Sequence, residues 1–173
     1  MHGMTMIEII VVIAIVAILA MIAVPSFVSS TQRIRVASNA SSLFSAMTFA
    51  RSEAIKRGIP VTICASSDQA TCLSSNVWET GWMVFTDVNA NKTVGTILKV
   101  QPKLTGADTF RSSNAAASVT FSRDGFAMGF PTGVPILTFT AHTTPDNVNA
   151  TKCVAISKTG RMATQSAGSG SCA

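Results

Sequence analysis

The most metal-like spacing in the chain is Asp87-x-Asn89-x-Asn91, three oxygen-bearing side chains at alternate positions. This spacing matches the start of an EF-hand calcium loop. Such a loop also needs glycine at its sixth position and a bidentate glutamate at its twelfth, and here those positions hold Lys92 and Leu98. The stretch is therefore predicted to be a polar turn, and we expect no metal and no other cofactor.

Nucleophilic catalysis lacks its usual partners in this sequence. The histidines are His2, near the start, and His142, which lies among threonines. No G-x-S-x-G or S-x-x-K motif is present to activate a serine. His142 is interpreted as a surface residue. We therefore expect no catalytic residue, no enzymatic activity and no small-molecule substrate.

The four cysteines lie as two local pairs, Cys64 with Cys72 and Cys153 with Cys172. Neither pair has the CxxC spacing of a metal or redox site. Because a membrane or export segment precedes them, an oxidising compartment and two disulfides are expected. Three pairings are open, and the local one closes the shortest loops. Closing the longer of these, about 20 residues, should stabilise the fold by about 3 kcal/mol.

Glu8 stands at the head of an unbroken apolar run, Ile9 to Val24. A secretory signal does not fit, because the chain starts Met-His-Gly without a basic residue and the run ends without a small-x-small cleavage site. A plain membrane anchor fits the length but not the acid, which is costly in a bilayer. Cleavage after Gly3 accounts for the acid, since the new amine of Met4 would lie within one helical turn of it. The two charges could pair between chains staggered along a filament.

The string Gly3-Met-Thr-Met-Ile-Glu8, followed by an apolar segment and Pro25, resembles the class III signal of type IV pilins and pseudopilins, usually G-F-T-L-I-E. In that family a prepilin peptidase cuts after the glycine and N-methylates the next residue, here Met4 in place of the usual phenylalanine. The resemblance implies an inner-membrane precursor, spanning at residues 4–25, whose helix later packs into a filament core. Pro25 is expected to kink or interrupt this helix.

Helical spacing continues after Pro25 and predicts a helix end at Gly58, which Ile59-Pro60 follows. The apolar face expected to pack on the rest of the chain is Val36, Ala40, Leu43, Phe44, Met47, Ala50, Ala54 and Ile55. Short β-rich runs separated by turns come next. This order predicts an α+β fold, a long kinked N-terminal helix packed on an antiparallel β-sheet domain, which is the pilin fold that the resemblance implies.

The expected organisation has three parts. They are a leader peptide at 1–3, the long N-terminal helix at 4–58, and a β-rich globular periplasmic domain at 59–173.

The stretch from Trp78 to Asn91, WETGWMVFTDVNAN, narrows the resemblance. It is similar to the W-x-x-G-W-x-V-F-x-D-x-N signature of the FimT, FimU and GspH group of minor pilins and pseudopilins. The preceding residues 49–64 are similar to the passage from helix to first strand in the same group. The resemblance covers about the first 95 residues well and the remainder weakly.

A net charge of +5 raises the question of nucleic acid. The basic excess is concentrated in residues 33–57, whereas residues 59–173 hold eight bases against six acids. A nucleic-acid-binding domain normally carries a basic face or stripe. The near-neutral domain therefore favours solvated charges over a nucleic-acid surface.

DNA binding is nevertheless an alternative, because some FimT-type pilins take part in DNA uptake through a C-terminal G-R-x-R element. Gly160-Arg161-Met-Ala keeps the first arginine of that element and lacks the second. With Lys152 and Lys158, Arg161 could form a small basic strip that contacts phosphates. The other interpretation is an ordinary strand end.

The resemblance implies a minor type IV pilin of the FimT/FimU type, a structural subunit for pilus assembly or priming. Its partners would be other pilins or pseudopilins in a filament, the prepilin peptidase and, before assembly, the inner membrane. Glu8 is the predicted assembly residue. The alternatives are a GspH-like pseudopilin of the type II secretion system and a DNA-binding minor pilin for natural transformation.

Overall fold

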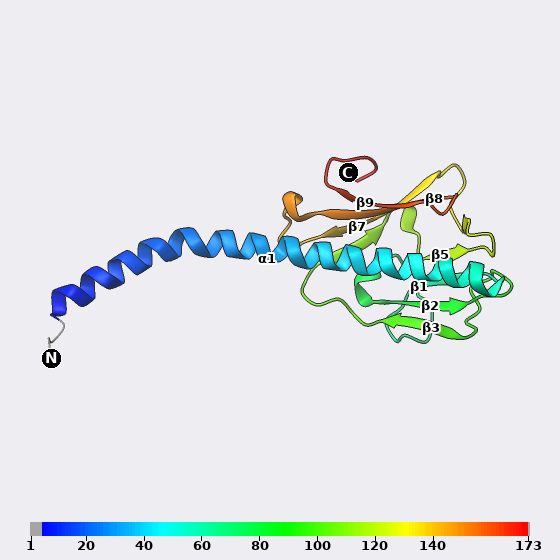
Figure 1. Ribbon diagram of the computed structural model, residues 1–173, viewed down its shortest axis with the longest axis horizontal. Coiled ribbons are helices and arrows are strands. Elements are labelled where there is room, and N and C mark those ends of the chain that lie inside the picture. The colour runs from blue at the N-terminus through cyan, green and yellow to red at the C-terminus, as the bar shows by residue number, and fades with distance from the viewer. Residues whose placement is uncertain (1–4, 173) are drawn as a thin grey trace.

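The computed structural model describes residues 5–172, apart from the side chains of residues 22–25. The chain begins with one long helix, α1 (Met6–Arg57), whose first half projects away from the remainder of the molecule (Figure 1). Its 52 residues correspond to a length of about 78 Å. The helix ends where predicted, because Gly58 adopts the left-handed conformation and its N–H caps the Ala54 carbonyl at 3.0 Å.

The remaining elements form two antiparallel sheets within the described residues. The first has the order β3-β2-β1-β5-β6, from β1 (Val61–Ala65), β2 (Trp82–Thr86), β3 (Ile97–Gln101), β5 (Ser118–Phe121) and β6 (Ala127–Met128). The second has the order β4-β7-β8-β9, from β4 (Thr109–Ser112), β7 (Ile136–His142), β8 (Lys152–Ser157) and β9 (Met162–Ser166). Three single 3₁₀ turns lie in the connections between described strands: η1 (Trp78–Thr80), η2 (Ser113–Ala115) and η3 (Val148–Ala150). The α+β prediction is confirmed.

The second half of α1 lies across both sheets and shares one hydrophobic core with them (Figure 1). Trp78 meets Phe139 of the second sheet edge to face, with ring centroids 4.9 Å apart. Trp82 of the first sheet meets Phe110 of the second at 6.4 Å. Such perpendicular pairs add about 1 kcal/mol each beyond their buried area. The two tryptophans therefore join the sheets beneath the helix.

The predicted apolar face of α1 is mostly confirmed and wrong at one position. Six of its eight residues are buried, Phe44 is half-buried, and Ile55 is 53% exposed. Ile55 lies in the last turn, where its neighbour is the tight turn at Gly125 and not a strand. Conversely, Ala46 and Glu53 are buried although the pattern did not include them. Two sheets cover a wider arc of the helix than the single sheet that the sequence predicted.

Both local disulfides are present, Cys64–Cys72 and Cys153–Cys172. The first closes a loop in which the Asp68 carboxylate accepts hydrogen bonds from the Thr71 hydroxyl and from two backbone N–H groups. These donors, the hydroxyl foremost, hold the pKa of Asp68 well below its ordinary value. The second disulfide fixes the C-terminal tail onto β8, and Cys172 is buried there.

Candidate assembly interface

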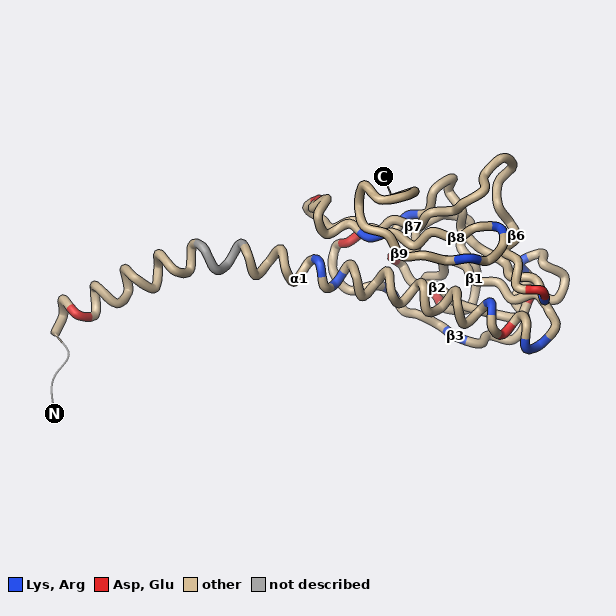
Figure 2. The backbone as a smooth tube through the Cα atoms, turned by 45° about the horizontal axis from the view of Figure 1, so that its top comes forward, with Lys and Arg blue, Asp and Glu red and all other residues tan. Residues whose placement is uncertain are grey.

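The first part of α1 is an apolar surface that nothing in the described chain covers. Between Met6 and Met21, twelve large apolar side chains are each at least 45% exposed. The most apolar 18-residue window of the helix has a mean hydropathy of 3.2 with no residue buried, so α1 is long and apolar enough to cross a membrane. No charged residue occurs between Glu8 and Arg33. Accordingly, the described parts of the projecting half of α1 are tan in Figure 2 after one red position near its start.

Glu8 lies in the first turn of α1 and takes part in a capping box. The Thr5 hydroxyl accepts a hydrogen bond from the Glu8 N–H at 3.4 Å, and the Glu8 carboxylate accepts one from the Thr5 N–H at 3.5 Å. The carboxylate therefore faces the helix N-terminus, where the helix dipole favours negative charge. The spacing Thr-x-x-Glu is a recognisable capping signal, but the sequence reasoning did not use it.

The other residues predicted at this end cannot be placed in the same way. Gly3 and Met4 lie outside the described residues, as does the side chain of Pro25. Cleavage between Gly3 and Met4, methylation of Met4 and a kink at Pro25 all stay predictions.

An ion pair fixes the direction in which α1 leaves the globular part. Arg35 donates to both carboxylate oxygens of Asp108, at 2.6 and 2.7 Å, and Asp108 is 7% exposed. The hydrogen bond to this carboxylate raises the pKa of Arg35. One helical turn earlier, the Gln32 side-chain oxygen accepts from Asn147 at 3.2 Å. These contacts hold the loops before β4 and after β7 against the helix, so the apolar segment projects at a defined angle.

A second attachment lies near the other end of the helix, at Arg51. The Arg51 Nε donates to the Gly125 carbonyl at 3.0 Å. The turn after β8 packs on the same group, because a Cβ atom at Gly160 would collide with the Gly125 carbonyl oxygen and lie 3.0 Å from the Arg51 Nε. The Ala127 N–H, in β6, also donates to the Lys158 carbonyl at 2.9 Å. Arg51 therefore holds one turn from each sheet.

These contacts explain the glycine at position 160 without any role in DNA binding. Its φ of +76° and its contact with the Gly125 backbone both require a residue without a side chain. Lys158 and Arg161 lie in and beside this turn and are both exposed. Of the predicted strip of three bases, Lys152 begins β8, about 20 Å from the turn along a six-residue strand, and contact of these bases with DNA stays a prediction.

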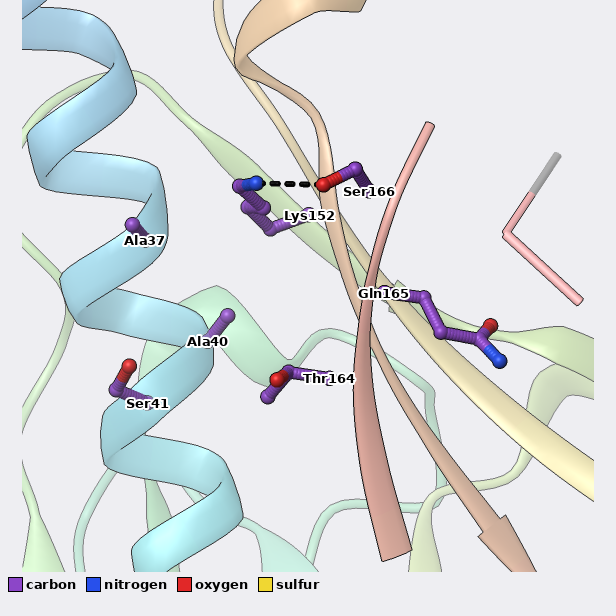
Figure 3. Close-up of a pocket in the computed structure, with 7 residues that line it drawn as sticks. All are labelled: Ala37, Ala40, Ser41, Lys152, Thr164, Gln165 and Ser166. Carbon is purple, nitrogen blue, oxygen red and sulfur yellow. Dashed lines mark hydrogen bonds between the residues drawn. The ribbon is translucent and has the colours of Figure 1, made fainter. Parts of the chain in front are cut away.

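Lys152 instead borders a shallow hollow of about 160 Å³ between α1 and the end of β9. In Figure 3, Lys152 and Thr164 lie on the side facing Ala37, Ala40 and Ser41 of the helix, and Lys152 donates to Ser166 at 2.7 Å. The hollow is lined by uncharged groups apart from this lysine. It offers no acid, thiol or histidine for catalysis.

The Asp87 stretch is the turn that the sequence predicted. The Asp87 carboxylate is buried, where it accepts from the backbone N–H groups of Asn91 and Lys92 and from the Thr62 hydroxyl. No group of three or more His, Cys, Asp or Glu side chains that could hold a metal ion occurs in the described part of the chain. His142 is partly exposed, 3.7 Å from the Asp146 carboxylate.

A long helix with an exposed apolar first half and an antiparallel β domain on its second half defines the pilin class of proteins. Within this class, the chain belongs to the family described as type II transport protein GspH, whose model matches residues 39–160.

Solved structures agree at the level of the fold. The type IV minor pilin FimU from Pseudomonas aeruginosa is similar over 78% of this chain and 91% of its own, with 22% identity and a TM-score of 0.60. A second crystal form of FimU covers 74% of this chain and 90% of its own, with 23% identity and a TM-score of 0.56. No curated protein sequence matches the chain.

Proposed function

We propose that the chain is a minor type IV pilin, cut between Gly3 and Met4 and packed into a filament through residues 4–25. The carrying observation is the exposed apolar half of α1. Burying twelve side chains of this kind is favourable by about 1.5–3 kcal/mol each, on the order of 20 kcal/mol together. A helix with this much exposed apolar surface needs lipid or other apolar helices around it, and a pilin uses first one and then the other.

In the membrane stage, residues 4–25 anchor the precursor in the inner membrane and residues 59–173 fold in the periplasm. Glu8 is tolerable there because it lies in the first helical turn, close to the bilayer boundary. The two disulfides fit this compartment, since the periplasm is oxidising.

In the filament stage, Glu8 needs a cationic partner, because an unpaired carboxylate among packed helices is strongly destabilising. The chain has no basic side chain between Glu8 and Arg33. The amine that cleavage creates on Met4 is therefore the one cation that this segment can supply. Glu8 of an inserting subunit is therefore paired when it lies beside the Met4 amine of a neighbour. This pairing fixes the axial register of the two helices.

The second candidate is a pseudopilin of the type II secretion system, and the match to the GspH family model favours it. Both candidates use α1 in the same way and differ in the machine that assembles them. DNA binding through Lys158 and Arg161 is a third candidate. Its support is limited to these two exposed basic side chains in and beside one turn. Loss of twitching pili on gene deletion supports the first candidate, and loss of protein secretion supports the second.

N-terminal sequencing of the protein from membranes and from sheared filaments tests the common step. We expect both to begin at methylated Met4, and Gly3→Ala to leave the precursor uncut in the membrane. A mature chain that starts elsewhere, or that never enters filaments, contradicts the proposal. Gel shifts with the full chain test the third candidate. We expect Arg161→Ala to keep the DNA affinity of the parent chain; a loss of affinity would support a DNA contact by Arg161.

A further inference from the structure

The outer edge of β3 is a free strand edge with apolar side chains. β3 pairs with β2 only, and no other described strand lies on its far side; it forms the lower margin of the domain in Figure 1. Ile97 and Val100 are 42% and 41% exposed. Their cross-strand partners are Phe85 and Met83, so they extend the apolar cluster on the face of this sheet that points away from α1. A strand added here would extend the ladder and that cluster together.

The same edge is basic. β3 and the residues just after it hold Lys99 and Lys103 and no acid. Both lysines are exposed, and neither forms a salt bridge within the described residues. Lys92 precedes β3 in the sequence but lies away from this edge, in a hollow that Ser118 of β5 also lines. The Lys99 ammonium lies 5.6 Å from the centre of the Phe49 ring, so it stays beside the strand.

The described part of the domain and of the helix packed on it offers no matching acidic surface. Each acid of the domain and of the helix packed on it is already engaged or isolated: Glu53 with Arg57, Glu79 with Arg111, Asp108 with Arg35, Asp68 and Asp87 within their loops, Asp124 beside Arg123 and Asp146 beside His142. Two β3 edges would bring like charges together, which natural edge strands use to prevent self-association. A second copy is therefore a poor occupant.

We infer that the free edge of β3 binds an acidic β-strand of a different filament subunit. Backbone pairing supplies the attachment, burial of Ile97 and Val100 extends the sheet face, and Lys99 and Lys103 select an acidic partner over a second copy. Nucleic acid is a weaker occupant, because it would use the charges and leave the strand edge and both apolar side chains unused. This contact deepens the proposed function, because it gives the globular domain a partner of its own. It rests on the proposed function in one respect only, namely that the partner is a subunit of the filament.

Photo-crosslinking of the full chain in its native host tests this. A photoreactive phenylalanine analogue replaces Val100 in one strain, Val148 in a second as an exposed apolar control distant from β3, and Ile13 in a third to report packing of α1. We expect the Val100 probe to capture a different chain with an acidic strand. Lys99→Glu with Lys103→Glu should lower that capture about tenfold, and Lys103→Glu alone, which leaves the Lys99–Phe49 contact intact, should lower it in part.

The controls separate this edge from the helix. Lys152→Glu with Lys158→Glu makes the same charge change elsewhere and should leave Val100 capture unchanged. Crosslinks at Ile13 should persist in every lysine variant; their absence in the parent chain would contradict filament packing and not the β3 edge. Capture of a second copy, capture removed by nuclease, capture equal to that at Val148, or no capture at Val100 would each overturn the inference.

Discussion

Replacing Gly160 with alanine should destabilise the protein by much more than its backbone conformation alone explains. The left-handed φ of +76° costs an alanine about 1 kcal/mol. The new Cβ would also collide with the Gly125 carbonyl oxygen, so the two turns must separate. Separation breaks the 3.0 Å hydrogen bond from the Arg51 guanidinium to that carbonyl, which contributes about 2 kcal/mol because its donor is charged. The expected loss is about 3 kcal/mol.

Gly168→Ala provides a matched control. Gly168 has nearly the same φ, +73°, but a Cβ there would meet no atom within 4 Å. It should therefore show only the conformational cost, about 1 kcal/mol. The free energy of unfolding is measured by urea titration of the oxidised full chain in detergent, followed by tryptophan fluorescence. Trp78 and Trp82 are almost fully buried, so their emission reports the loss of the core.

Equal losses in Gly160→Ala and Gly168→Ala would refute the contact between the turns and the role assigned to Arg51. An additional check is Arg51→Met, which keeps the aliphatic stem; it should lose about 2 kcal/mol, and adding Gly160→Ala to it should cost less than Gly160→Ala does in the parent chain.

Three further predictions concern the ion pair, the acid limit and the tail. Arg35→Met should cost about 2 kcal/mol in urea unfolding, because it leaves the buried Asp108 carboxylate without its partner, and Asp108→Asn added to it should recover part of that loss. Because folding lowers the pKa of Asp68, its contribution is present above the unfolded value of 3.8 and is lost as pH falls below it, so Asp68→Asn should flatten the fall in stability there; an unchanged slope would contradict the hydrogen-bonded loop. Cys153→Ala with Cys172→Ala should cost about 3 kcal/mol and expose the tail to proteases, whereas a protected tail would show that other contacts hold it.

The sequence was sufficient for those parts of the fold that depend on local signals. Gly58 with Ile59-Pro60 after it predicted the helix end, and the apolar spacing predicted most of the buried helix face. Ile55 was wrong because burial at the last turn depends on which distant segment covers it. Glu53 is buried beside Arg57, and its burial depends on segments distant in sequence, which no local pattern specifies.

The candidate site was predictable in its residues and not in its geometry. Glu8 was singled out because an acid before an apolar run needs a reason, and the structure adds that Thr5 directs it toward the helix N-terminus. Lys152 lies a whole strand away from Lys158 and Arg161, a separation that spacing in the sequence alone does not give. The anchoring role of Arg51 depends on contacts some 74 residues apart, which spacing cannot predict.

Incorporation of Glu8→Gln into sheared filaments is the most direct measurement of the proposed assembly step. Glutamine can keep the capping hydrogen bond to Thr5 and removes only the charge. We predict that this variant is cut after Gly3 at the parent rate, accumulates in the inner membrane, and is absent from filaments, as is Glu8→Ala. Normal incorporation of Glu8→Gln, with loss only in Glu8→Ala, would show that Glu8 acts as a helix cap and would contradict pairing with the Met4 amine.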